Sequence, residues 1–246
     1  MGDFSAQVMG CGMDGETLML FCDGFFGMAN LVSKVVAQSF PIISDGDSVL
    51  SFSAEKEKVK EYIRNNKTAK ARFMDVVLAY VFKQNPHYAK QYMIDRKYVQ
   101  LVELFRDAFK IFVVAHEYAH LCLGHLSKEN TKRKTDILND YERVIYSWVE
   151  EGSADLLATQ ITVLSSDDAA LGIAGIWICL NVIDILDALN VNDNDDKSIL
   201  QQYFTHPPVE IRKENIKNAM ENKEDCFALL DTIDYIFTEL RKYLDR

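Results

Sequence analysis

The sequence predicts an α+β protein that is mostly helical, with a small N-terminal β-sheet. Short apolar runs separated by a turn signal occupy the first 22 residues, whereas the chain after residue 55 repeats apolar side chains at helical spacing. Only 4 Pro and 11 Gly occur in 246 residues, so no stretch resembles a long linker. We therefore expect one domain over residues 1–246, with the sheet and first helix in 1–55 and a helical part in 56–246.

The N-terminal part is expected to begin with a hairpin. Thr17–Cys22 is a short apolar run, and the turn signal Met13-Asp14-Gly15 before it can direct the chain back along Ser5–Met9. A helix is expected at Phe25–Ser39, where apolar residues recur on one face. Two further extended segments are expected at residues 40–43 and 48–52.

Helical periodicity continues to the end of the chain. Gly124 is expected to end the most apolar helix, because glycine tolerates the left-handed conformation of that position. The expected helices are Lys56–Lys83 (as one helix or two), Tyr98–Leu123, Asp136–Leu164 (with an interruption), Asp168–Asn190, Val209–Asn222 and Asp225–Leu244.

The composition excludes some classes of function. A formal net charge of −10 and a pI of about 5.0 disfavour nucleic-acid binding, because an acidic surface repels phosphates. The five cysteines include no CxxC pair, and the N-terminus lacks a signal-peptide pattern, so we expect a cytoplasmic protein. The longest apolar run, Ala169–Leu180, is too short to span a membrane, and no membrane partner is expected. The oligomeric state stays open.

A metal-binding pattern lies near the end of the most apolar helix. Residues 116–120 read HEYAH, which matches HExxH. His116 and His120 stand four residues apart and therefore share one helix face, from which both imidazoles can reach one zinc ion. Glu117 lies beside them and is expected to act as general base rather than as a ligand.

A catalytic zinc usually takes three protein ligands. The metzincin pattern HExxHxxGxxH fails, because Leu123 and Leu126 occupy its glycine and last histidine positions. Residues 148–155 read WVEEGSAD, which resembles the ExxAD pattern of gluzincins and implies Glu151 as the third ligand. Asp155, one turn later, is expected to accept a hydrogen bond from a ligand histidine.

Two rival ligands remain open. Glu150 is adjacent to Glu151 but has no acidic residue four positions on. His125 could also bind the metal, although a role behind a ligand or on the surface is the preferred interpretation.

HEYAH followed by EGSAD resembles the gluzincin zinc metallopeptidases, and this resemblance implies a zincin-like fold with an HExxH active-site helix. The segment from His206 to Arg212 reads HPPVEIR and resembles the HPPxxxR segment of the CAAX-prenyl-protease and heat-shock-protease group. The extension ending Gly124-His125 resembles soluble Lit-like proteases. By motif order the resemblance covers residues 98–212. The transmembrane helices of the membrane group have no counterpart in this sequence.

The predicted function is zinc-dependent hydrolysis of a peptide or protein substrate, with Glu117 moving the proton of the attacking water. The resemblance implies that His206 stabilises the developing oxyanion. Arg212 either holds a substrate carbonyl or anchors its segment through a carboxylate, and both residues could instead be structural. Two alternatives stay open: a non-catalytic zinc-binding regulatory or interaction module, and a triggered, host-directed protease in phage defence.

Overall fold

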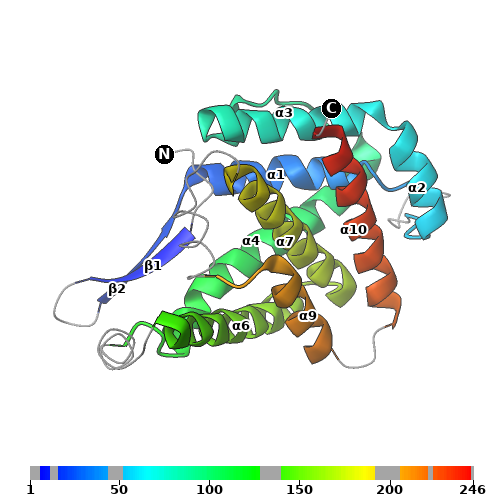
Figure 1. Ribbon diagram of the computed structural model, residues 1–246. Helices are drawn as coiled ribbons and strands as arrows, with labels where there is room; N and C mark the ends of the chain where they lie inside the picture. The colour runs from blue at the N-terminus through cyan, green and yellow to red at the C-terminus, as the bar shows by residue number, and fades with distance from the viewer. Residues whose placement is uncertain are drawn as a thin grey trace.

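The computed structural model describes residues 6–11, 16–43, 52–127, 140–191, 206–220 and 224–244. Within these residues the chain is mostly helical, as the sequence predicts, and the regular strands are confined to an N-terminal hairpin (Figure 1).

The hairpin pairs strand β1 (Ala6–Cys11) with strand β2 (Glu16–Phe21) in antiparallel register, so that β1 extends two residues beyond its predicted end. The two further extended segments, at 40–43 and 48–52, form no regular strand in the described residues. They are joined only by an isolated antiparallel bridge between Ile42 and Phe52. Residues 48–51 of the second segment lie outside them.

Helix α1 (Asp23–Ala37) follows β2 after a single residue and is buried along most of its length. The region predicted as one helix or two forms two, α2 (Lys56–Asn65) and α3 (Lys67–Lys83). Asn66 divides them: its backbone leaves the helical region, and its side chain accepts a hydrogen bond of 3.0 Å from the backbone N–H of Ala69. This is the capping that asparagine commonly supplies at the start of a helix.

Two short 3-10 helices, η1 (Pro86–Tyr88) and η2 (Arg96–Tyr98), lead into the central helix α4 (Val99–Cys122). Helix α4 makes its most extensive contacts with α6 (Asp140–Ser165) and α7 (Ala169–Val191). The interruption predicted within Asp136–Leu164 is absent from the described residues, because α6 is continuous from residue 140 to residue 165. The part of that prediction before residue 140 lies outside the described residues.

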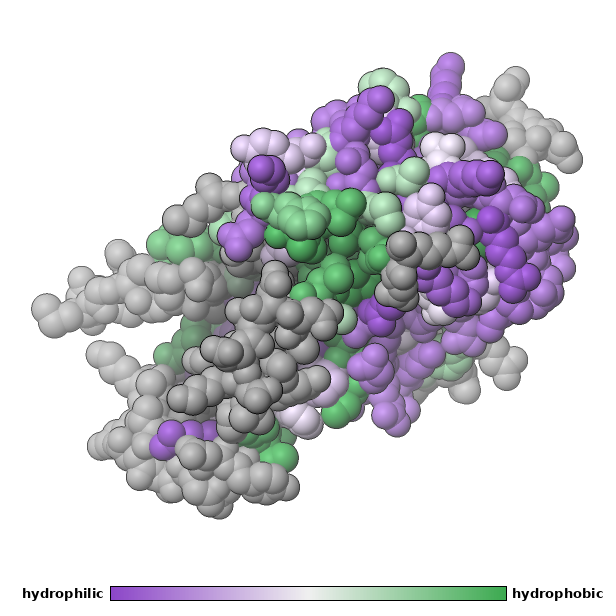
Figure 2. Space-filling model, turned by 45° about the horizontal axis from the view of Figure 1, so that its top comes forward, coloured by the Kyte–Doolittle hydropathy of each residue, from purple (hydrophilic) through white to green (hydrophobic). Residues whose placement is uncertain are grey.

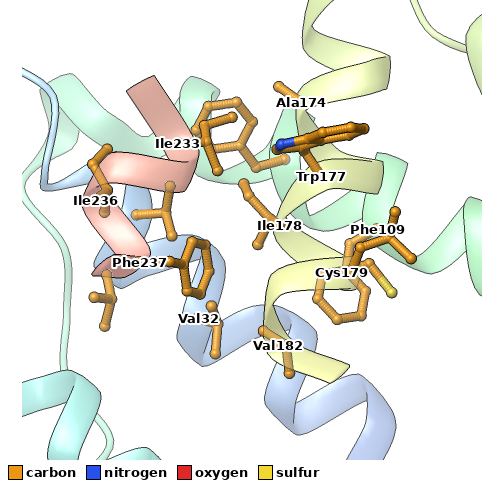
Figure 3. Packing of buried hydrophobic residues seen from close by; sticks show 14 of the residues in the cluster. Val32, Phe109, Ala174, Trp177, Ile178, Cys179, Val182, Ile233, Ile236 and Phe237 are labelled. Atoms are coloured by element: carbon orange, nitrogen blue, oxygen red, sulfur yellow. The ribbon is translucent and has the colours of Figure 1, made fainter. Parts of the chain in front are cut away.

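Helix α7 is the core helix of the molecule. Ala169–Leu189 is long and apolar enough to cross a membrane, but 78% of its most apolar window is buried inside the protein. Gly175 lets α7 approach α4 closely, since an added Cβ would lie 2.4 Å from the Cβ of Ala108. Figure 3 shows side chains of α7, among them Trp177 and Ile178, packed with those of neighbouring helices.

The last helices are α9 (Val209–Ala219), three residues shorter than predicted, and α10 (Glu224–Leu244). Helix α9 packs on α6 and α7, and α10 packs on α2, α3 and α7. In the view of Figure 2, hydrophilic residues cover much of the helical part, and a hydrophobic area is exposed near its centre. Helix α6 thus contacts α4, α7 and α9.

Candidate metal centre

The end of α4 and the middle of α6 place three side chains around one point. His116 and His120 lie on the face of α4 that packs on α6, and Glu151 faces them from α6. The Nε2 atoms of the two histidines are 3.2 Å apart. Each of these atoms lies 3.3 Å from a different oxygen of the Glu151 carboxylate. The two nitrogens and the carboxylate therefore surround one point, and these three groups are called the ligand triangle below.

This triangle is the only group of three or more His, Cys, Asp or Glu residues in the described part of the chain whose donor atoms could hold one metal ion. Its members are shielded from water: the side chains of His116, His120 and Glu151 are 10%, 13% and 10% exposed. Glu151 Oε2 is buried with no hydrogen bond to it in the described residues, and His116 Nε2 lies 3.3 Å away. A buried carboxylate oxygen left in this way is costly unless a cation compensates it. The residues present therefore fit a metal ion.

A buried ion pair supports His116 from behind. The carboxylate of Asp155 can only accept hydrogen bonds, so His116 Nδ1–H donates to Asp155 Oδ1 over 2.9 Å, and Nε2 faces the triangle. Arg212 donates through Nε to Asp155 Oδ2 at 2.7 Å and through Nη2 to Oδ1 at 2.6 Å. Burial alone would raise the pKa of Asp155, but the Arg212 guanidinium and the His116 hydrogen bond lower it to about 2.

Arg212 is 6% exposed, and its guanidinium is engaged by Asp155. Of the two roles expected for this residue, the geometry favours the carboxylate anchor over contact with a substrate carbonyl. Helix α9 begins after Pro208 and places Arg212 one turn into the helix, where it reaches α6. The HPPVEIR segment is thereby attached to the residue that orients His116.

His206 precedes α9 and lies at the open side of the ligand group. Its Nε2 is 3.8 Å from Glu151 Oε2, and its side chain is 57% exposed. Partial desolvation over the ligand group lowers the pKa of His206, while the Glu151 carboxylate opposes this shift. Glu117 is half-buried on α4, next to the ligand His116. The structure therefore brings His206 close to the ligand group, and it places Glu117 on the same helix as the two ligand histidines.

The two rival ligands lie outside the triangle. Glu150 is buried on α6 and is not a member of the ligand group. His125 lies behind His120, with the two Nδ1 atoms 2.8 Å apart, and its own Nε2 is 3.3 Å from Ser153 Oγ. Ser153 lies between Glu151 and Asp155 in the chain, and no role in the site was predicted for it. The signal that could have indicated the His125 contact is Gly124, the residue that reverses the chain after α4.

Comparisons with protein families, with curated proteins and with solved structures gave no match.

Metal binding is expected to weaken as the pH falls below about 9. Burial would lower the pKa of His116, but its hydrogen bond to Asp155 and its contact with Glu151 raise it to about 9. The metal-free centre therefore carries a proton on His116 at neutral pH, and a metal ion must displace it. We expect the affinity to rise about tenfold per pH unit up to pH 9 and then to level off.

Chelator competition at several pH values measures this affinity. Calorimetry in two buffers with different ionisation enthalpies measures the released proton. An affinity that stays constant below pH 9, with no proton release, would contradict the expected charge on His116.

Proposed function

We propose that this chain is a zinc-dependent peptidase of the gluzincin type, built on a zincin-like fold. The observation that carries the proposal is the convergence of His116, His120 and Glu151 at one buried point. Glu117 follows the ligand His116 in the chain. Two sequence patterns 30 residues apart thus supply one ligand set. The His₂Glu combination is typical of catalytic zinc sites, which leave a fourth position for water or substrate.

Zinc fits the dimensions of the ligand group. Zinc–nitrogen bonds of about 2.0–2.1 Å and zinc–carboxylate bonds of about 2.0–2.2 Å in a tetrahedral site place neighbouring donor atoms about 3.3–3.5 Å apart. Here the two Nε2 atoms are 3.2 Å apart, and each lies 3.3 Å from one of the two Glu151 oxygens. Structural zinc sites are usually closed sets of Cys and His. Here a carboxylate takes part and no cysteine belongs to the described ligand group, which favours a catalytic centre.

Zinc bound at this point would supply the Lewis acidity that activates water and polarises a peptide carbonyl. The residues of the chain supply the remaining chemistry. Glu117 accepts the proton of the attacking water and delivers it to the leaving amine. His206, exposed beside the ligand group, donates a hydrogen bond to the oxyanion that develops on the substrate. Asp155 and Arg212 keep the His116 ring oriented.

The first test is zinc content combined with hydrolysis. Wild-type protein and Glu151→Ala are purified without added metal, and zinc per chain is measured by elemental analysis. We expect close to one zinc per chain in the wild type and markedly less in Glu151→Ala. Glu150→Ala is the matched control, because it removes the neighbouring buried carboxylate without altering the ligand group, and it should keep its zinc.

Hydrolysis is then followed with a mixture of quenched fluorescent peptides and with a cell lysate. Cleavage by the wild type should stop on chelation and return when zinc is restored. A wild type that binds no zinc even when it is supplied would overturn the metal site. A zinc-loaded wild type that cleaves no peptide and no lysate protein would favour a non-catalytic zinc-binding module.

A further inference from the structure

The end of α4 turns the chain back towards the metal ligands. The N–H of Gly124 donates to Leu121 O at 3.1 Å, and the N–H of His125 donates to His120 O at 3.0 Å. These two bonds form a complete Schellman motif, which requires a left-handed residue after the helix. Gly124 takes that position with φ of 71°. The motif places His125 directly after the turn, where its ring returns to the ring of His120.

The hydrogen bonds of His125 form a chain whose direction is fixed at its far end. The backbone carbonyl of Glu150 can only accept, so Ser153 Oγ–H donates to it over 2.9 Å. With that proton engaged, Ser153 Oγ acts as the acceptor for His125 Nε2–H at 3.3 Å. A neutral His125 protonated at Nε2 has a bare Nδ1, which accepts from His120 Nδ1–H at 2.8 Å.

This direction has a consequence for the metal ligand. If Nδ1 of His120 carries the proton, Nε2 of the neutral ring has a free lone pair. That Nε2 is the atom in the ligand triangle, 3.2 Å from its counterpart on His116. The chain of bonds from the Glu150 carbonyl through Ser153 and His125 therefore selects the tautomer of His120 that can bind a metal ion.

The two ligand histidines are thus supported by different chemistry. His116 donates to a buried carboxylate that is itself paired with Arg212. His120 donates to a neutral imidazole supported by a hydroxyl and a backbone carbonyl. A carboxylate behind His120 as well would add a negative charge to a centre that already holds Glu151 and Asp155. The neutral support orients His120 without adding that charge.

We propose that His125 is a positioning residue for the metal centre, which holds His120 in its metal-binding tautomer through a hydrogen-bond chain completed by Ser153. The proposal rests on the proposed metal site. It assigns His125 a role behind the ligand His120 and no direct contact with the metal.

The test compares metal affinity and coordination among the wild type, His125→Leu, His125→Asn and Ser153→Ala. Zinc affinity is measured by competition with a chromogenic chelator, and the visible absorption of the cobalt-substituted proteins reports the coordination geometry. We expect His125→Leu to bind zinc about 10–100-fold more weakly, with an altered cobalt spectrum. His125→Asn should restore most of the affinity, because its Oδ1 offers an acceptor close to the position of Nδ1. Ser153→Ala should lose less than His125→Leu.

His87→Leu is the matched control for the loss of a histidine, since His87 pairs with Asp23 on α1 and lies outside the ligand group. Thermal unfolding of the metal-free variants separates a loss of fold from a loss of affinity. His125→Leu that binds zinc as tightly as the wild type, with an unchanged cobalt spectrum, would overturn the positioning role and leave the metal site intact. A wild type that binds neither metal would overturn the metal site and this inference together. If His125→Leu does not fold, His125→Asn and Ser153→Ala decide the question by the same measurements.

Discussion

Glu117→Gln is expected to reduce peptide hydrolysis by about 10²–10⁴-fold while the zinc content stays at the wild-type level. Glutamine has the size of glutamate but cannot accept the proton of the attacking water. Glu117 lies outside the ligand triangle, so its replacement leaves the three donor groups in place. The measurement is the initial rate of cleavage of the best peptide from the screen, together with zinc per chain for the same preparations.

Glu103→Gln is the matched control, because Glu103 is exposed on the same helix and precedes the ligand histidines by more than three turns. It should cleave at the wild-type rate. A Glu117→Gln variant that keeps both its zinc and its activity would exclude Glu117 as the general base. Loss of zinc in this variant would show instead that Glu117 supports the ligand group.

The helices could be predicted because each one buries an apolar face, and that face leaves a periodic pattern in the sequence. The residues at which the helices end were harder to predict. Asn66 ends one helix and caps the next through a local side-chain bond, which periodicity does not reveal. The predicted interruption is absent from residues 140–165, although Gly152 lies within α6. Packing of α6 along α4 outweighs the low helix propensity of a single glycine.

The parts of the candidate site that depend on spacing within one helix could be predicted from the sequence. His116 and His120 share a face of α4, and Glu151 and Asp155 share a face of α6. Contacts between helices could not be predicted from sequence in the same way. The choice of Asp155 rather than a substrate as the partner of Arg212 depends on how α9 packs against α6, and the sequence contains no periodic signal for that packing.

Arg212→Leu is expected to destabilise the metal-free protein by about 3–5 kcal/mol, because it leaves one partner of a buried ion pair uncompensated. Asp155 is fully buried, and Arg212 contributes two of its hydrogen bonds. Without the guanidinium, burial raises the pKa of Asp155, and the hydrogen bond that orients His116 weakens. Urea unfolding at neutral pH measures the free energy, and chelator competition measures the accompanying loss of zinc affinity.

Arg241→Leu is the matched control, since Arg241 pairs with Asp184 while both side chains are partly exposed. An ion pair of that kind contributes about 0–1 kcal/mol. The double variant Arg212→Leu with Asp155→Asn removes both buried charges and should be more stable than Arg212→Leu alone, because an uncharged amide is less costly to bury. Equal losses for Arg212→Leu and Arg241→Leu would contradict a buried pair. A double variant that regains stability but not zinc affinity would assign the Asp155 carboxylate to the orientation of His116 and not only to the folding of α9.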